Sequence, residues 1–212
     1  MTRTRTICCV SLLALTAAPA LADDLTPPPW RFNPGTTVQH WDFSGGPLGG
    51  APDALPLNNP YGTPMMVPTT GTNWLPGFGG RNHLWDITGG SLQFDIPNTG
   101  NSAHIKNLQI QVTYLGIAPA IGPGYVVSGP NGLFTQVGGP TITTLPNGWL
   151  HEVTTWTIGV CPPFERITIA PGLVGVQMIL DQVVIDTQCI VPSPASASLL
   201  ALGGLCALRR RR

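Results

Sequence analysis

The sequence IKNLQIQVTYL at residues 105–115 decides the fold class of this chain. Within it, apolar and polar residues alternate: Leu108, Ile110, Val112 and Tyr114 against Gln109, Gln111 and Thr113. Successive side chains of a β-strand point to opposite faces, so this alternation predicts a half-buried antiparallel strand.

Similar short runs of β-branched and aromatic residues, bounded by turn signals, continue along residues 23–190. The predicted strands are 37–43, 83–88, 91–96, 105–115, 124–128, 141–145, 148–158, 166–170, 176–180 and 182–189. Gly89-Gly90, between two of these runs, predicts a hairpin turn. Residues 44–80 are dense in Gly, Pro and Asn, and they predict a long ordered loop or a few edge strands.

Proline and glycine exclude long helices from the central region. Residues 23–190 hold 20 of the 23 prolines and 24 of the 26 glycines, and both residue types weaken or break helices. About ten short strands without a helix predict one all-β domain, an antiparallel two-sheet sandwich that is jelly-roll-like. The only helix that we expect is an apolar one at the C-terminus.

Residues 1–22 have the pattern of a signal peptide. Arg3 and Arg5 precede an apolar stretch at residues 7–18, and Ala20-Leu21-Ala22 supplies a small-x-small cleavage site. The apolar stretch is shorter than the roughly 20 residues of a membrane anchor. We therefore expect export, with signal peptidase as the partner that removes residues 1–22.

The C-terminus combines prolines, an apolar run and an arginine cluster. An apolar stretch at residues 195–208 follows Pro192-Ser193-Pro194, and four arginines come after it: Arg209, Arg210, Arg211 and Arg212. Counted from Ile190, a helix here is about 28 Å long, close to the roughly 30 Å hydrocarbon core of a bilayer. The arginines would stop at the cytoplasmic face. The rival interpretation is an apolar helix that docks on the domain.

This ending resembles the PEP-CTERM sorting signal of bacterial exported proteins. The matching features are Pro192 and Pro194, the run 195–208 and the arginine cluster, whereas Ser193 replaces the acid that usually separates the prolines. The resemblance implies export, transient inner-membrane anchoring by the tail, and processing by an exosortase, a membrane-embedded cysteine transpeptidase-like enzyme. Residues 40–44, 59–64 and 181–186 are also similar to uncharacterised cargo domains of this family, which implies no activity.

The charge distribution excludes a nucleic-acid binder. The chain balances 10 basic against 10 acidic residues, but residues 23–190 carry four basic residues against all ten acids, a net charge of 4 − 10 = −6. Phosphate neutralisation needs clustered Lys and Arg, and Lys106 is the single lysine of the chain.

Cys161 and Cys189 are the cysteine pair of the central region. Cys8 and Cys9 lie in the signal peptide and Cys206 lies in the tail. An even pair in an oxidising compartment predicts a disulfide. The rival interpretation, a nucleophilic thiol at Cys161, is disfavoured because Pro162-Pro163 follow directly.

The sequence lacks the motif of a serine hydrolase and offers one weak candidate pair for a glycoside hydrolase. None of the four serines of residues 23–190 sits in a G-x-S-x-G motif. Glu152 and Glu165 are the only glutamates, and a pair across a cleft would fit a glycoside hydrolase. We therefore predict no catalytic residues and keep a secreted glycoside hydrolase as an alternative.

Metal-site motifs are equally weak. His40-x-Asp42 and His83-x-x-Asp86 each place a histidine near an acid, but H-E-x-x-H is absent. We predict no metal and no cofactor. The alternative is a calcium ion held by loop aspartates, for which the candidates are Asp23, Asp24 and Asp53.

All six tryptophans lie in the central region. Trp41, Trp85 and Trp156 occupy strand positions and are predicted core residues, whereas Trp74 falls in a Gly- and Pro-rich stretch predicted to be a loop. Trp74 and Trp30 are candidate ligand-binding residues, because flat aromatic faces hold sugar rings in carbohydrate-binding modules.

The sequence thus predicts an exported, non-catalytic protein of the cell envelope, cell surface or extracellular matrix. A domain that resembles a carbohydrate-binding module, with polysaccharide as its partner, stays open as an alternative.

Overall fold

The fold is described from a computed structural model, which describes residues 23–57, 59–116 and 121–191. Nine strands form sheet A: β1 (Thr36–Trp41), β2 (Ala54–Leu57), β4 (Asn73–Phe78), β5 (Arg81–Asp86), β7 (Ile105–Gly116), β10 (Thr135–Gln136), β11 (Thr141–Thr144), β12 (Leu150–Ile158) and β14 (Met178–Ile190). Five strands form sheet B: β3 (Met65–Pro68), β6 (Leu92–Pro97), β8 (Pro123–Gly129), β9 (Gly132–Leu133) and β13 (Phe164–Pro171). A single-turn 3₁₀ helix, Pro146–Gly148, precedes β12.

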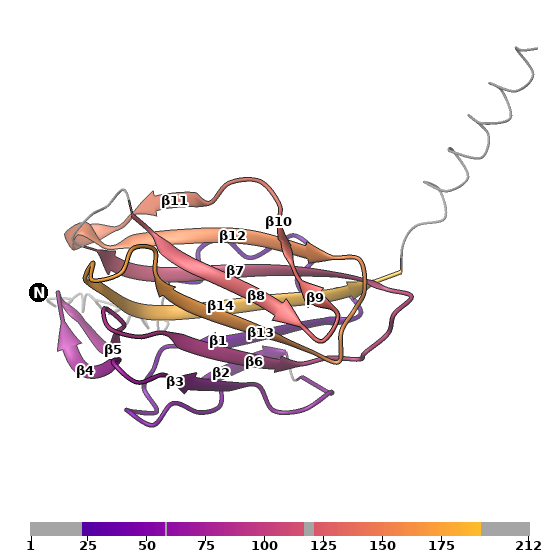
Figure 1. Cartoon of the computed structure of the whole chain (residues 1–212), viewed down its shortest axis with the longest axis horizontal. Coiled ribbons are helices and arrows are strands. Elements are labelled where there is room, and N and C mark those ends of the chain that lie inside the picture. The colour runs from indigo at the N-terminus through magenta and orange to yellow at the C-terminus, as the bar shows by residue number, and fades with distance from the viewer. Residues whose placement is uncertain (1–22, 58, 117–120, 192–212) are drawn as a thin grey trace, which may run out of the picture.

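The two sheets are antiparallel, which confirms the predicted all-β, two-sheet architecture. Sheet A has the order β10-β12-β7-β14-β1-β2, with β11 beside β12 and the β4–β5 hairpin attached through β5 to β14. Sheet B has the order β3-β6-β13-β8-β9. Figure 1 shows the two layers lying one over the other, with the β4–β5 hairpin at one end of the sandwich.

The predicted alternation in β7 places its apolar residues between the sheets. The row from Leu108 to Tyr114 is fully buried and belongs to one core with residues of β14 and of sheet B. Trp41 of sheet A meets Phe94 of sheet B edge to face, with the ring centroids 4.9 Å apart. Aromatic pairs of this geometry stabilise a core beyond the area they bury.

The two runs predicted at 176–180 and 182–189 form one strand, β14. The register of β14 against β7 shifts between Leu180 and Gln182. A β-bulge inserts one residue, here Asp181, and lets a strand continue across a change of alternation. The break in the sequence pattern at Asp181 is therefore a bulge and not a turn.

The hairpin predicted at Gly89-Gly90 is wrong. The strand before it, β5, belongs to sheet A, whereas β6 after it belongs to sheet B. The glycines are needed for a close approach, because a Cβ on Gly89 would lie 2.9 Å from the carbonyl oxygen of Gly71, and a Cβ on Gly90 would lie 2.8 Å from that of Thr70. Residues 44–80 contain three short strands, β2, β3 and β4, in agreement with the edge-strand interpretation of that region.

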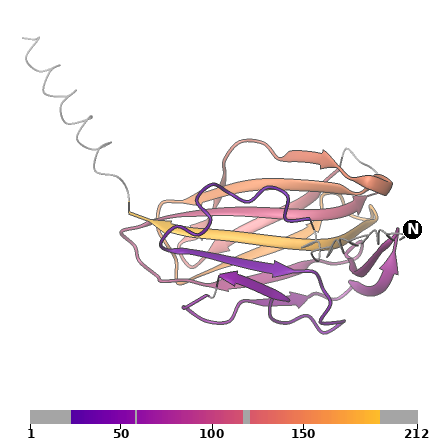
Figure 2. The ribbon, with the colours of Figure 1, turned by 180° about the vertical axis from the view of Figure 1, so that it is seen from behind.

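Residues 23–35 cross the outer face of sheet A before the chain enters β1. Figure 2 shows this indigo segment running over β12, β7 and β14. Its backbone is bound to β7 at Thr26, which donates to Gln111 Oε1 at 3.1 Å and accepts from Gln109 Nε2 at 2.6 Å. The polar face of β7 is thus covered by chain instead of facing water.

Within the three described ranges, no helix has the length and apolar character needed to span a membrane. The helix predicted at the C-terminus and the signal peptide at residues 1–22 lie outside the described residues.

Candidate functional site

The end of the sandwich at which β14 finishes is the candidate site, because the predicted sorting tail begins there. The described chain ends one residue after β14, at the exposed Val191. The sorting residues predicted from the sequence all lie beyond it and outside the described residues: Pro192, Ser193, Pro194, Arg209, Arg210, Arg211 and Arg212. In Figure 1 this end of β14 lies opposite the β4–β5 hairpin.

A disulfide joins Cys161 and Cys189 at this end, as predicted. Their Cα atoms are 5.8 Å apart, and both residues are buried. Cys189 is the penultimate residue of β14, and Cys161 lies in the connection between β12 and β13. Both half-cystines also donate through their backbone, Cys189 to Gly35 at 3.1 Å and Cys161 to Asn101 at 3.2 Å. The thiol interpretation of Cys161 is therefore wrong, because its sulfur is in the disulfide.

A buried lysine lies beside the disulfide. Lys106 of β7 pairs across the sheet with Cys189 and is fully buried between the layers. Its Nζ donates to Asn98 Oδ1 at 2.5 Å and lies 3.3 Å from Glu165 Oε1 of β13. Burial lowers the pKa of Lys106 and raises the pKa of Glu165 to about 7, while the attraction between the two groups opposes both shifts.

The two glutamates do not form a glycosidase pair. Glu152 pairs across the sheet with Val112 of β7, whereas Glu165 contacts Lys106, six residues away on the same strand. At about 3.4 Å per residue these positions are about 20 Å apart, beyond the roughly 5–10 Å of a hydrolytic pair. Glu152 instead accepts from Tyr114 Oη at 3.3 Å, and burial raises the pKa of its carboxyl group.

The carboxylates proposed for calcium are each occupied by protein donors. Asp53 accepts from the backbone N–H groups of residues 42, 43 and 45 and from the hydroxyl group of Ser44. Asp23 is paired with Arg81, and Asp24 is paired with Arg31. The part of the chain that the structure describes contains no group of three or more His, Cys, Asp or Glu side chains suited to a metal ion.

Trp74 and Trp30 are half-buried. The prediction that Trp74 lies in a loop is wrong. Trp74 belongs to β4, pairs with Trp85 of β5 and packs against the core. Its indole N–H donates to the carbonyl oxygen of Phe43 at 3.2 Å, and the ring of His83 stacks at a centroid distance of 6.2 Å. These contacts leave less of the flat face of Trp74 free, and a free flat face was the feature that favoured sugar binding. Trp30 lies in the segment that covers sheet A.

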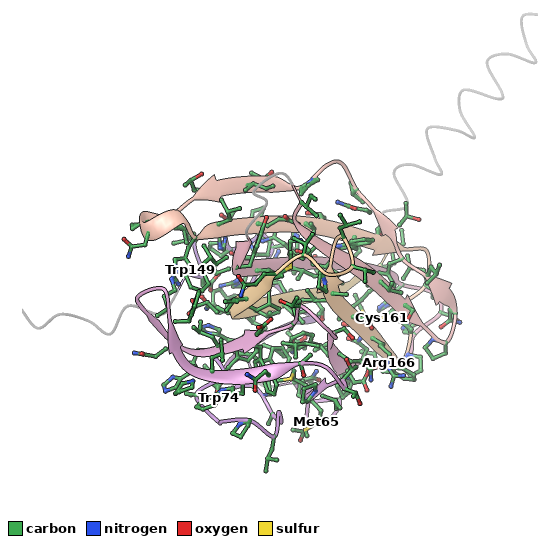
Figure 3. All side chains as sticks on the ribbon, turned by 60° about the vertical axis from the view of Figure 1, so that its left-hand side comes forward. Met65, Trp74, Trp149, Cys161 and Arg166 are labelled. Carbon is green, nitrogen blue, oxygen red and sulfur yellow. A yellow bond between two sulfur atoms is a disulfide. The ribbon has the colours of Figure 1, made fainter. Side chains whose placement is uncertain are left out.

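The other tryptophans serve packing. Trp41, Trp85 and Trp156 are buried in the core, as predicted. Trp149 is also fully buried, donates to the carbonyl oxygen of Gly79 at 3.0 Å and carries the Arg81 guanidinium 5.0 Å from its ring centroid. Figure 3 shows Trp149 near the hairpin and Cys161 toward the other end of the molecule.

Two ion-pair clusters hold residues 23–35 against sheet A. Arg31 bridges Asp24 and Asp186, with its Nη2 donating to Asp186 Oδ2 at 2.7 Å and to Asp24 Oδ1 at 3.0 Å. Arg81 bridges Asp23 and Asp181. Sequence reasoning missed both clusters, because their members are far apart in the chain and belong to no motif.

We expect Asp181→Asn to flatten the pH dependence of stability between about pH 4 and about pH 6. Burial raises the pKa of Asp181 to about 6, although Arg81 opposes the rise. In this range the folded state binds more protons than the unfolded state, so this carboxyl group makes stability fall as pH rises. Urea midpoints of both proteins at several pH values measure the effect, and parallel curves would contradict it.

Two cavities of the sandwich are small. One, between Trp41, Phe43, Asp53 and Met66, has a volume of about 20 Å³, and the other, between Thr88, Pro171 and Val174, has about 190 Å³. Ligand pockets usually begin at roughly 300 Å³. Neither cavity is large enough for a typical organic ligand.

No protein-family model matches this chain, and no curated protein sequence matches it.

Proposed function

We propose that this chain is an exported, non-catalytic protein of the cell surface or extracellular matrix, delivered by its C-terminal sorting tail. Residues 1–22 would be removed by signal peptidase. The tail would anchor the protein transiently in the inner membrane through its apolar helix until an exosortase-like enzyme processes it.

We further propose that the sandwich is jelly-roll-like, because the strands β6, β7, β8, β12, β13 and β14 lie alternately in sheet B and sheet A.

The observation that carries this proposal is the attachment of the tail to the domain. The strand that leads into the tail, β14, is flanked by β7 on one side and β1 on the other. The Cys161–Cys189 disulfide also joins the end of β14 to the connection between β12 and β13. A strand bonded on both edges cannot fray without breaking two ladders. Such an arrangement suits a passenger that must stay folded while its tail is held and processed.

The experiment is to follow the chain through export with an internal epitope tag. The connection between β10 and β11 accepts a tag at Gly138-Gly139, where both residues are exposed and a side chain would meet nothing within 4 Å. Mass spectrometry of the tagged protein recovered from its cell should show that residues 1–22 are gone and that the tail has been cut near Pro192-Ser193-Pro194. Recovery of the intact chain from the cytosol would overturn the proposal.

Two variants of the tail sharpen this experiment. Replacing all four arginines, residues 209–212, by alanine should abolish processing, because the tail would lose the charge that fixes its topology. Ser193→Glu restores the usual acid of the motif and should increase the processed fraction. If both variants are processed like the wild type, the tail is not the signal.

The carbohydrate-binding alternative has a separate test. Trp74→Phe preserves most of the packing of β4 and removes the indole ring, so retention on insoluble polysaccharides would fall only if Trp74 contacts sugar. If the wild-type protein is not retained on any polysaccharide, this alternative is wrong. The sorting proposal is unaffected by that result.

A further inference from the structure

Three reactive side chains meet inside the sandwich at the end where β14 finishes. Lys106 lies on β7 of sheet A, Glu165 lies on β13 of sheet B, and Asn98 directly follows β6. Lys106 and Glu165 have no exposed surface, and Asn98 is 8% exposed. A buried amine, carboxamide and carboxyl group in contact are costly for stability, because each must be desolvated.

The amine of Lys106 lies within reach of the side-chain amide of Asn98. Lys106 Nζ lies 2.5 Å from Asn98 Oδ1, and the amide carbon Cγ is one carbonyl bond, about 1.2 Å, further on. The nitrogen is therefore within about 3.7 Å of that carbon, close to the roughly 3–3.5 Å of a near-attack arrangement. The amide nitrogen Nδ2 of Asn98 is directed at the carbonyl oxygen of Ile96, at 3.4 Å, which holds Oδ1 toward the lysine.

The surroundings favour the reactive protonation states. Burial lowers the pKa of Lys106, which favours the neutral amine that a nucleophile requires. Burial raises the pKa of Glu165 to about 7, so its carboxyl group can hold a proton. Lys106 Nζ, 3.3 Å from Glu165 Oε1, is the cation that faces this carboxyl group, so the carboxyl group lies beside the nitrogen with which it would exchange protons.

We propose that Lys106 and Asn98 join in an intramolecular isopeptide bond, with Glu165 as the catalytic acid and base. The neutral Nζ of Lys106 attacks Cγ of Asn98, and the carboxyl group of Glu165 protonates the amide. The C–N bond to Nδ2 then breaks, ammonia leaves, and the proton lost from Nζ returns to Glu165. One C–N bond forms and one breaks, so the reaction needs no oxidant or other reactant.

The bond would fasten the two sheets together. Asn98 follows a strand of sheet B and Lys106 belongs to sheet A, so the cross-link bridges the layers next to the Cys161–Cys189 disulfide. The sandwich would then be closed covalently at the end where the tail departs. Unlike the disulfide, this closure resists reduction.

Lys106 is the single lysine of the chain, which makes the test direct. The exported wild-type protein is reduced, alkylated and digested with trypsin, which normally cuts after lysine and arginine. An isopeptide bond blocks cleavage at Lys106, so residues 82–166 should appear as one peptide whose mass is lower by one ammonia. Peptides 82–106 and 107–166 at their unmodified masses would overturn the proposal.

Amine labelling of the denatured protein supplies a second measurement. An amine-reactive reagent should label the N-terminus only, because the side chain of Lys106 has become an amide. A labelled Lys106 in the bulk of the protein would equally overturn the proposal.

Two variants assign the roles of the residues. Lys106→Arg keeps a positive charge and a trypsin site but cannot form the bond, so its peptide 82–106 should keep the mass expected for its sequence. Loss of ammonia from that peptide would mean a cyclised asparagine and would overturn the proposal. Glu165→Gln should leave Lys106 free and cleavable, and a bond that still forms in this variant would remove Glu165 from the mechanism.

Discussion

Arg31→Ala is expected to lower the free energy of unfolding by about 3–5 kcal/mol. The Arg31 side chain is only 7% exposed and Asp186 is fully buried, and Nε and Nη2 of Arg31 donate to the two oxygens of Asp186 at 2.5 and 2.7 Å. Removing the guanidinium leaves the Asp186 carboxylate buried without its charge partner, and it also releases Asp24. Urea denaturation of both proteins measures the change.

The matched control is Arg166→Ala. Arg166 makes the same two-point contact with Asp95, at 2.7 and 2.8 Å, but this pair lies on sheet B with side chains 46% and 33% exposed. Figure 3 labels Arg166 on the side of the molecule away from Trp149. Exposed pairs contribute about 0–1 kcal/mol, so this variant should differ little from the wild type.

Limited proteolysis tests whether the stability lost in Arg31→Ala comes from the release of residues 23–35. If Arg31 pins residues 23–35 to sheet A, Arg31→Ala should make that segment cleavable while the strands stay protected, whereas Arg166→Ala should not. Equal losses of stability in the two variants would contradict the importance of burial.

Local patterns were enough to predict most of the longer strands and the disulfide, but not the two-residue strands β9 and β10. The alternation from Leu108 to Tyr114 depends only on the two faces of a strand, and the pairing of Cys161 with Cys189 follows from their being an even pair. The predicted hairpin at Gly89-Gly90 failed, because two glycines between strands have the same pattern whether the chain stays in one sheet or crosses to the other. The loop prediction for Trp74 failed because strand pairing with β5 overrides its Gly- and Pro-rich surroundings.

Contacts between distant residues were not predictable in this way. Arg31 and Asp186 are separated by 155 residues, and no spacing rule joins them. One signal was available for the buried cluster at the tail end. Lys106 shares its strand parity with Leu108 and Ile110, so its side chain should point into the core, where a lysine needs a partner.

The double substitution Cys161→Ala with Cys189→Ala is expected to lower the free energy of unfolding by roughly 3.5 kcal/mol, because the disulfide closes a chain segment of about 29 residues in the unfolded state. For a domain of this size the melting temperature should fall by about 10 °C. The proposed bond between Asn98 and Lys106 closes a separate segment of chain, so it does not replace the constraint that the disulfide supplies. Thermal unfolding followed by circular dichroism measures the change.

Cys206→Ala in the unprocessed chain is the matched control, because it removes a cysteine of the tail without breaking the disulfide. It should leave the melting temperature of the domain unchanged. The wild type treated with a reductant strong enough to open the buried disulfide should in turn approach the double variant, since alanine and the reduced thiol both release the same loop. A double variant as stable as the wild type would mean that the fixed end of β14 is held by the sheet ladders and the neighbouring buried cluster, and that the disulfide adds little to them.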